Sequence, residues 1–579
     1  MPTDTTARSA VGGAGASSGE LIRSIDWKGA FWVASGVPAL VLFSLGGIAG
    51  VSGRLAFLVW AISILMGFVQ SFTYAEIAGL FANKSGGPAV YGATAWLRYS
   101  KFAGPLLLWC YWFAWSPVLS LGCALAAGYI LNAWAPIPAF TDASPDVIAW
   151  LADPANKGKV VADAIAAVTG AHTPAIQSWE LLSFSIPGFG TAHLNAVFVI
   201  GVLIMLAIFA VQHRGIASTA NVQKWIGVIV IATLLVVSLL PILTGKINWG
   251  NYSPLVPPKA LASAENGTWN WSGWTLFLGG LYIAAWSTYG FETAICYTRE
   301  FRNPKTDTFK AIFYSGVLCM VLFMLVPFTF QGVLGLDGLL AGPIVSGSGI
   351  ADAAATMVGG GSIVHGVLVL LMIMALVLTI MTAMAGSSRT LYQGSVDGWL
   401  PKYLSKVNAH GAPDRAMLTD LLFNVAVLAI ASDATGFFFV LAISNVGYMI
   451  FNFLNLNAGW MHRVDSGHLP RPWRAPSWLI GVNTVLAFAN AVLLGAGAKT
   501  WGYSTGLWWG FGMALLIVPI FAYRHYVRDG GQFPPNMLAD MGLEGQDLGE
   551  RKAGMLPYAT VAAGLAVVLV SNWLFPLPA

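Results

Sequence analysis

The chain has 579 residues, of which 57% are hydrophobic and 9% charged, and its net charge is +4. Soluble proteins carry about 25% charged residues, so this composition excludes a water-soluble globular protein and predicts a membrane protein with many spans. The small, dispersed net charge does not indicate nucleic-acid binding. The four cysteines lie in apolar segments without metal-ligand spacing, so we expect reduced core residues and no metal site.

Hydrophobic runs predict about thirteen spans, because one crossing needs about 20 mostly apolar residues. The last run follows a polar segment and is the least marked of them. The candidate spans are 29–51, 55–80, 103–134, 192–212, 217–243, 273–297, 311–335, 362–388, 416–432, 436–459, 477–497, 505–525 and 554–575.

The segments outside these spans predict the orientation of the chain. Residues 1–28 lack the apolar core of a signal peptide, so we expect a cytosolic tail. With the N-terminus inside, 23 of the 29 Lys and Arg residues lie in inner segments. Basic segments stay on the cytoplasmic side, which predicts a cytoplasmic N-terminus in a plasma membrane, the inner membrane of a bacterium. The outer insertion 136–191 is long enough for an ordered flap or a lid.

Two of the predicted spans contain helix-breaking residues. The first span reads ASGVP at residues 34–38, and the sixth reads STYG at residues 287–290. Pro38 removes a helical hydrogen bond, and Gly36 tolerates an irregular backbone. A separation of five spans gives the two breaks opposite orientations in the membrane, which is typical of inverted repeats around a substrate site. Ordinary packing kinks are the alternative, because Gly and Pro are frequent in membrane helices.

Three parts of the sequence resemble the amino acid, polyamine and organocation (APC) permeases. They follow the family's YAEL and SGG patterns, its GF(D/E) and E..NP patterns, and its SR.LY and DG.LP patterns. The matching segments are TYAEIAG (73–79), SGGPAVY (85–91), YGFE (289–292), EFRNP (300–304), SRTLY (388–392) and DGWLP (397–401). The resemblance implies an all-α LeuT-like fold of 5+5 inverted repeats, with discontinuous helices 1 and 6 and about 12 to 13 transmembrane helices.

On this resemblance, the chain divides at the ends of the two repeats. The first repeat covers 29–243 and the second 273–459. Spans at 476–526 follow, then a cytosolic linker at 527–553 and a further helix with the C-terminus at 554–579.

The sequence departs from the family pattern at two places. The family usually reads Ile-Gly-(Ser/Thr/Ala)-Gly-Ile-Phe at the first break, whereas this chain has Ala34 and Pro38 around the matching Ser35 and Gly36. That run presents backbone N–H groups to a substrate carboxylate, so an amine substrate stays open. Several members also carry a lysine in span five that bridges helices 1 and 8. Lys224 lies too close to the inner end for that role, so we do not expect coupling through a lysine.

The backbone groups freed at the breaks predict the binding chemistry. N–H groups after Ser35 and Gly36 favour an anion, and carbonyl groups near Ala285 and Trp286 favour an ammonium, which together suit an amino acid or an amine. Resemblance to arginine/agmatine exchangers suggests that Trp286 covers the substrate or stacks on a cation; the alternative is a core or lipid-facing residue. The predicted substrate-binding residues are Ser35, Gly36, Val37, Ala285, Trp286, Ser287, Tyr289 and Gly290.

The candidates for coupling or gating are Glu292, Trp286, Glu76, Ser387 and Ser388. Glu292 could exchange a proton as its surroundings change between apolar and aqueous, or it could be a fixed hydrogen-bond acceptor.

The other acids and hydroxyls have simpler explanations. Glu76 and Asp420 are expected to bond inner-loop arginines such as Arg389 or Arg98. Hydroxyl groups of span eight could hold Na⁺ against helix 1 or could serve helix packing; they belong to Thr379, Thr382, Ser387 and Ser388. We favour H⁺ over Na⁺ as the coupling ion and expect no cofactor.

These features predict a secondary active transporter for an amino acid or organic amine that works by alternating access. The alternative is a receptor that binds the same ligands without turnover. An enzyme is not expected, because the sequence lacks His-Glu-x-x-His, a nucleophile elbow and a phosphate loop. A channel would need a continuous polar path, which paired breaks disfavour. The expected partners are the substrate and the lipid bilayer, and the sequence leaves the oligomeric state open.

Overall fold

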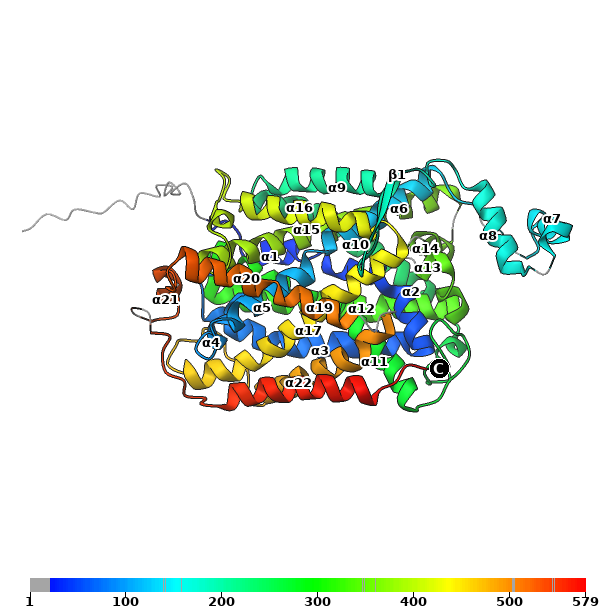
Figure 1. The fold of residues 1–579 in the computed structure, drawn as a ribbon. Helices are drawn as coiled ribbons and strands as arrows, with labels where there is room; N and C mark the ends of the chain where they lie inside the picture. Colours follow the sequence, from blue (N-terminus) through cyan, green and yellow to red (C-terminus); the bar gives the residue numbers. More distant parts are fainter. Residues whose placement is uncertain are drawn as a thin grey trace, which may run out of the picture.

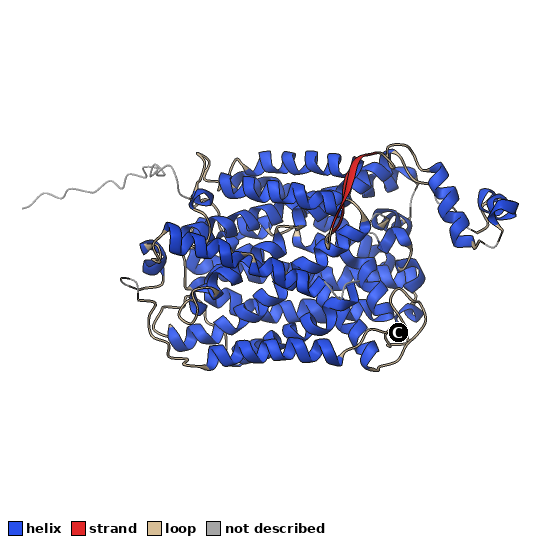
Figure 2. Ribbon diagram, viewed as in Figure 1, coloured by secondary structure: helices blue, strands red, loops and turns tan. Residues whose placement is uncertain are grey.

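Long helices make up most of the protein. The computed structural model describes residues 21–138, 140, 142–157, 159–345, 347, 349–359, 361–501, 506–543, 545 and 547–578. These residues form an elongated helical bundle with one small two-stranded sheet (Figures 1 and 2). This architecture confirms the predicted all-α membrane fold. Residues 1–20 of the predicted tail lie outside the described part.

Nine stretches of the described residues are long and apolar enough to cross a membrane. The first, Trp27–Gly79, has 53 residues, which is enough for two crossings of about 20 residues each. It holds α1 (Trp27–Val33), α2 (Val41–Ser52) and α3 (Ala56–Gly79). The others hold α5 (Ala103–Trp115) with α6 (Val118–Trp134), α10 (Ile216–Leu243), α12 (Pro304–Leu339), α15 (Ser362–Val396), α17 (Ala434–Asp465), α18 (Ser477–Val492), α19 (Gly506–Leu515) with α20 (Ile517–Ala522), and α22 (Leu556–Leu574).

Three further predicted spans are helical but shorter or more polar than these nine. α9 (Ala196–Gln212) has 17 residues. α11 (Trp271–Thr288) is rich in Gly, Ser, Thr and Trp, and α16 (Asp414–Ala431) contains Asp414, Arg415 and Asp420. α11 packs against α2 and α3, and α16 packs against α6, α9 and α17. Each of the thirteen predicted stretches therefore contains a helix, although fewer meet the length and composition of a membrane span.

The first and sixth predicted spans are discontinuous, as predicted. α1 ends at Val33, and after a turn at residues 34–36, the first break, a short 3-10 helix η1 (Val37–Leu40) leads into α2. α11 ends at Thr288, and after Tyr289, the second break, the chain continues as the 3-10 helix η5 (Gly290–Glu300). Below, α1, η1 and α2 are called helix 1, and α11 and η5 are called helix 6. A Cβ on Gly36 would lie 2.5 Å from the carbonyl oxygen of Leu378 in α15. Only glycine therefore lets the first break approach α15 this closely.

The two ends of the bundle carry different elements (Figure 1). Figure 1 shows α21 (Pro535–Asp540) at one end, here called the basic end, and α7 (Pro145–Ala152) and α8 (Val161–His172) at the other, the insertion end. Arg23 and Lys84 lie beside α21 at the basic end. α7 and α8 pack around a small core of Val147, Ala164 and Val168 and project from the bundle. The remaining elements are α4 (Pro88–Trp96), α13 (Gly342–Val345), α14 (Ile350–Val358), η2 (Gly53–Leu55), η3 (Pro154–Asn156), η4 (Trp249–Tyr252), η6 (Lys402–Ser405), η7 (Leu493–Gly497), η8 (Ala498–Trp501) and η9 (Tyr523–Arg528).

The insertion also contains a β-hairpin that we did not predict. β1 (Glu180–Ile186) pairs antiparallel with β2 (Gly190–Asn195). Phe189 at the turn contacts Phe439 of α17 and Trp509 of α19. The hairpin therefore docks on the bundle through its aromatic tip.

The segment 527–553, expected as a linker, is packed against the basic end. It includes α21, and the side chains of Phe533, Met537, Leu538 and Met541 are at most 3% exposed. Burial of four apolar side chains favours a docked segment over a free connection.

Candidate functional site

The first break is attached to α15 by threonine side chains. Thr382 Oγ1 donates to the carbonyl oxygen of Val33 at 2.6 Å, and Thr379 Oγ1 donates to that of Gly36 at 2.8 Å. A helix end leaves such carbonyls without helical partners, so the threonines replace the missing hydrogen bonds. The other two proposed sodium ligands bond elsewhere: Ser387 donates to Asp420 at 2.5 Å and Ser388 donates to Met384 in its own helix at 2.7 Å.

Gln223 of α10, which sequence reasoning missed, joins the same two helices. Its Nε2 donates to the carbonyl of Val33 at 3.1 Å, to Thr382 Oγ1 at 3.1 Å and to the carbonyl of Leu378 at 3.4 Å. A neutral amide of α10 thus bridges the first break and α15. Lys224, the next residue, is exposed over the ring of Trp225.

Most backbone N–H groups at the first break are already used. Those of Ser35 and Val37 donate to Trp32 and Ala34. The hydroxyl of Ser35 also donates to the carbonyl of Trp32, at 2.6 Å. Among the described residues, the N–H of Gly36 has no hydrogen-bond acceptor. Of the N–H groups that we predicted to bind a carboxylate, the described structure therefore leaves that of Gly36 available.

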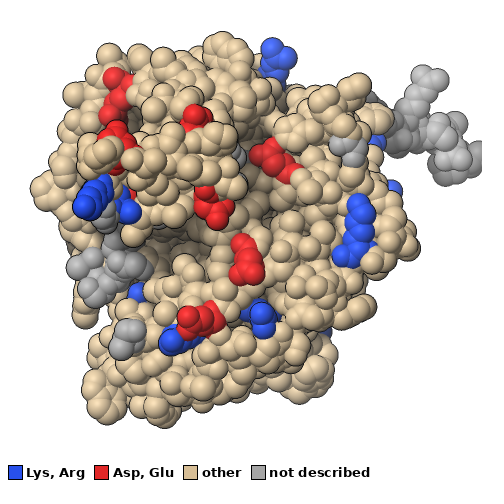
Figure 3. All heavy atoms as spheres, turned by 90° about the vertical axis from the view of Figure 1, so that its right-hand side faces the viewer, with Lys and Arg blue, Asp and Glu red and all other residues tan. Residues whose placement is uncertain are grey.

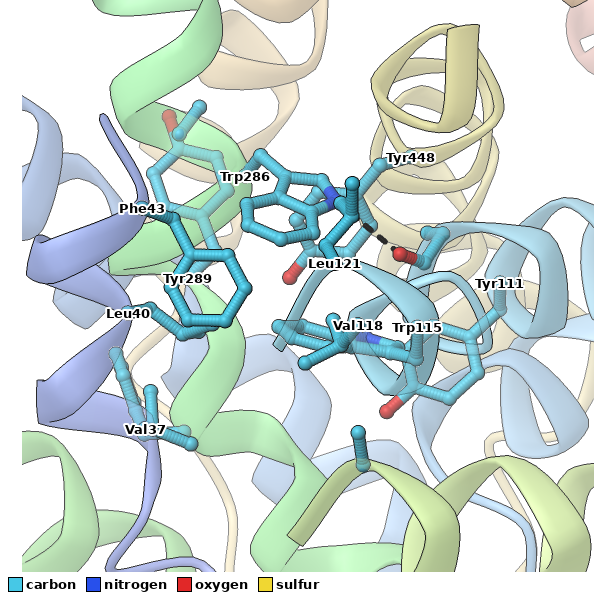
Figure 4. Packing of buried hydrophobic residues seen from close by; sticks show 14 of the residues in the cluster. Val37, Leu40, Phe43, Tyr111, Trp115, Val118, Leu121, Trp286, Tyr289 and Tyr448 are labelled. Carbon is cyan, nitrogen blue, oxygen red and sulfur yellow. Dashed lines mark hydrogen bonds between the residues drawn. The ribbon is translucent and has the colours of Figure 1, made fainter. Parts of the chain in front are cut away.

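At the second break, Trp286 is enclosed by protein. Its side chain is fully buried, and its Nε1 donates to the carbonyl of Ala114 at 3.1 Å. Its ring stacks on that of Trp115 in α5, with centroids 6.2 Å apart, and lies 5.9 Å from that of Phe43 in α2. Figure 4 shows this cluster between the three helices. The alternative of a lipid-facing Trp286 is therefore wrong.

Trp115 is a second residue that sequence reasoning missed, and it contacts the second break directly. A Cβ on Gly290 would lie 2.4 Å from Cη2 of Trp115 and 3.1 Å from Cγ1 of Val37. Gly290 thus allows helix 6, helix 1 and α5 to meet at one point. No sequence signal distinguished Trp115, because it lies in an apolar run with Trp109 and Trp112.

The other residues predicted at the second break have different surroundings. The carbonyl of Ala285 accepts the N–H of Tyr289 at 3.2 Å, which uses one of its two lone pairs. The hydroxyl of Tyr289 donates to Asn490 of α18 at 3.4 Å. Ser287 is buried, and its hydroxyl has no partner among the described residues.

Glu292 places a carboxyl group beside this aromatic cluster. It is 1% exposed, and its Oε1 accepts a hydrogen bond from the hydroxyl of Tyr448 in α17 at 2.5 Å. Tyr448 in turn lies edge-on to Trp115, with centroids 5.4 Å apart. Among the described residues, Oε2 has no hydrogen-bond partner, and no Lys or Arg side chain forms an ion pair with Glu292. An isolated buried charge is costly, so this environment suits the neutral carboxyl group.

Between the breaks and the basic end lie two buried ion pairs. Arg389 binds Glu300 through two hydrogen bonds of 2.7 and 3.0 Å, and Lys84 Nζ lies 2.7 Å from Asp397 Oδ1. All four side chains are at most 3% exposed. Thr390 of α15 also donates to the carbonyl of Gly86 at 2.9 Å. The loop 84–87 is thereby fixed to α15, and the basic end is closed.

Glu76 and Asp420 bond to partners other than those we expected. Glu76 binds Arg463 and Arg471, at 2.6 and 3.2 Å, rather than Arg389 or Arg98. Asp420 accepts hydrogen bonds at 2.5 to 2.9 Å from side chains of α5, the α5–α6 turn and α15, and it binds no arginine. These donors are Trp112, Ser116 and Ser387. Glu76 therefore connects α3 to the end of α17, and Asp420 connects α16 to its neighbours.

The insertion end of the molecule, which Figure 3 views, is hollowed near its centre. Acidic side chains lie around this depression. Among the described residues, no group of three His, Cys, Asp or Glu side chains is placed to hold a metal ion. The arrangement is thus a candidate site between two helix breaks, closed toward the basic end.

Comparison with known proteins agrees with this geometry. The sequence profile of the amino acid permease family matches residues 25–523. The branched-chain amino acid permease BcaP of Lactococcus lactis subsp. cremoris (strain MG1363) is 24% identical over 445 residues, which cover 73% of this chain and 88% of the relative. The profile match includes both breaks, Glu292 and the buried ion pairs. The chain therefore belongs to the amino acid permease family of membrane transporters.

Proposed function

We propose that the protein is a secondary active transporter that takes up an amino acid by alternating access. The observation that carries this proposal is the meeting of two broken helices at Gly290 and Val37. Helix breaks near the middle of a membrane protein are tolerated where they line a cavity or a ligand. The buried ion pairs at one end and the depression at the other suit a state that opens toward the insertion end.

The distribution of basic residues supports an orientation for this state. Arg23, Arg299 and Lys402 lie at the basic end, and 23 of the 29 Lys and Arg residues fall in the segments predicted to face the cytoplasm, so we place this end in the cytoplasm of the plasma membrane. The structure then corresponds to a form that is closed to the cytoplasm.

The chemistry of the site supports a neutral, apolar amino acid as the substrate. The N–H of Gly36 can donate to a carboxylate, and the Ser287 hydroxyl is available for a further hydrogen bond. Around them, Figure 4 shows apolar side chains, which suit an apolar substrate side chain, and among the described residues no Lys or Arg forms an ion pair with Glu292. These side chains are Val37, Leu40, Phe43, Val118 and Leu121. The branched-chain permease relative makes leucine, isoleucine and valine the first compounds to test.

The environment of Glu292 supports proton coupling over sodium coupling. The hydroxyls of Thr379 and Thr382 already donate to carbonyls of the first break, and the amide of Gln223 lies among the same oxygens. Glu292 has a free Oε2 and no cation partner, so it can take up a proton without losing an ion pair. In our proposal it binds a proton with the substrate and releases it when the cytoplasmic side opens.

Uptake of labelled leucine into proteoliposomes tests this function. An inward proton gradient should drive accumulation by the wild-type protein. Glu292→Gln should abolish gradient-driven accumulation and retain exchange of internal for external leucine, because the amide cannot exchange a proton. Asp547→Asn, at an exposed position, serves as a matched control. Binding without accumulation would favour a receptor, and sodium-driven uptake in the variant would contradict the role of Glu292.

A further inference from the structure

The closed basic end depends on Lys84 and Asp397. Both side chains are fully buried, and their ion pair joins the loop after α3 to the end of α15. Alternating access requires these two elements to separate, so anything that covers the pair controls opening. In this structure the pair is covered by a third part of the chain.

That part is residues 533–543, the closing segment. Asp540 Oδ2 lies 3.6 Å from Nζ of Lys84, so the lysine faces two carboxylates. Met537 is fully buried and Leu538 is 2% exposed, which places this helix in the protein rather than on its surface. Between the closing segment and the loop 82–84 lies a polar cavity of about 360 Å³, lined by Asn83, Arg23 and Asn536 among others.

The closing segment also contacts the loop before α5, on the side away from Lys84. Phe533 lies under Nζ of Lys101, 5.6 Å from the ring centroid, in the loop before α5. Farther along, Arg98 donates to the carbonyl of Leu548 at 3.1 Å, and Asp465 accepts the N–H of Ala553 at 3.0 Å. The closing segment contacts the loop before α5, and the chain that follows it contacts the ends of α4 and α17. Both parts lie beyond the residues that match the family profile, which end at 523.

We propose that the closing segment is the outermost layer of the gate at the basic end. Asp540 holds Lys84 beside Asp397, and the buried face of α21 must leave its place before the gate can open. The proposal rests on the proposed alternating access. It adds Asp540 and Met537 as residues that set how often the basic end opens.

A native cysteine reports opening of this gate without knowledge of the substrate. Cys296 is fully buried below the gate loop; its carbonyl accepts the N–H of Gly86 at 2.9 Å, and a Cβ on Gly87 would lie 2.8 Å from its Sγ. The rate at which a membrane-impermeant maleimide labels Cys296 from the basic side of the full-length protein therefore measures opening. Cys296→Ser identifies the labelled site.

We expect Asp540→Asn to raise the labelling rate about two- to fivefold, which corresponds to loss of a partly exposed ion pair. Met537→Ala should raise it about tenfold or more, because it removes a buried side chain. Asp547→Asn, an exposed acid outside the closing segment, should leave the rate unchanged. Wild-type rates in both Asp540→Asn and Met537→Ala would overturn the proposal.

A second experiment, which links the closing segment covalently to the loop 82–84, tests the proposal if Met537→Ala does not fold. Asn83→Cys and Asn536→Cys line the same cavity, so a cleavable thiol cross-linker can join the closing segment to the gate loop. Linked protein should lose net leucine transport and regain it after cleavage, with Asn83→Cys alone plus reagent as the control. Unchanged transport by linked protein would contradict the role of the segment. If even unlinked protein transports no amino acid, the proposed function fails, whereas Cys296 labelling still reports on the gate.

Discussion

The two helix breaks differ in how their polar groups are satisfied. At the first break, the carbonyls of Val33 and Gly36 receive hydrogen bonds from Thr382, Thr379 and Gln223. At the second break, four buried side-chain atoms have no partner among the described residues. They are Ser287 Oγ, Glu292 Oε2, Thr293 Oγ1 and the Tyr297 hydroxyl.

We infer from this difference that the first break has a structural role and the second a binding role. Buried polar groups are normally hydrogen-bonded, and each that is not calls for a functional explanation. Hydrogen bonds from side chains rigidify the groups that they join, so the carbonyl side of the first break is expected to keep its geometry through the transport cycle. Among the described residues, the N–H of Gly36 and Oε1 of Gln223 are its unpartnered groups. The second break has free polar atoms that can meet a substrate or a proton.

The largest expected effect distinguishes the two glycines. A Cβ on Gly36 would approach backbone atoms of Leu378, whereas a Cβ on Gly290 would approach the side chain of Trp115. Backbone yields less than a side chain, so Gly36→Ala should cost about 3 kcal/mol of stability and Gly290→Ala about 1 kcal/mol. Thermal unfolding of the purified variants measures this. Equal melting temperatures would remove the contrast between a rigid and an adaptable break.

The next effect concerns the amide bridge at the first break. Gln223→Leu removes a donor shared by two carbonyls, so we expect a loss of about 1 to 2 kcal/mol in stability. The pH dependence of leucine uptake should remain that of wild type, since no titrating group is changed. A shifted pH profile would show that the first break takes part in coupling.

A smaller effect is expected on selectivity through Trp115. Trp115→Phe keeps an aromatic ring against Gly290 but frees space beside Val37. The ratio of uptake for phenylalanine to that for valine should rise about tenfold, which is typical of small changes in a hydrophobic pocket. Competition assays measure the ratio, and Trp109→Phe, on the same helix, is the control. An unchanged ratio would place the substrate side chain elsewhere.

The smallest effect tests the hydrogen bond between the Tyr448 hydroxyl and the carboxyl group of Glu292. Tyr448→Phe removes the donor to Oε1 and should cost about 1 kcal/mol in stability. Without this donor the carboxylate form is less favoured, so uptake should persist to higher pH than in wild type. Uptake measured from pH 5 to 9, a range that spans the usual titration of shifted carboxyl groups, checks the direction. A shift to lower pH would mean that Tyr448 does not stabilise the charged form.

The sequence by itself determined the class of fold and the positions of both breaks. Composition and long apolar runs require a membrane bundle, because a bilayer demands them locally in the chain. Gly36, Pro38 and Gly290 act on the backbone within a few residues of themselves, so their effect can be predicted without neighbours. Glu292 was recognisable for a similar reason, since a carboxyl group in an apolar span is conspicuous.

Tertiary structure alone decided which residues surround these breaks. Gln223, Trp115 and Tyr448 lie on three other helices, and inside apolar spans nothing in their local sequence sets them apart. The partners of Glu76 were misassigned for the same reason, because Arg463 is 387 positions away. The packing of the closing segment against the bundle was not predicted, since its buried side chains are few and the surface that receives them is built from distant helix ends. Contacts between spans depend on packing across the bundle, which a local pattern does not encode.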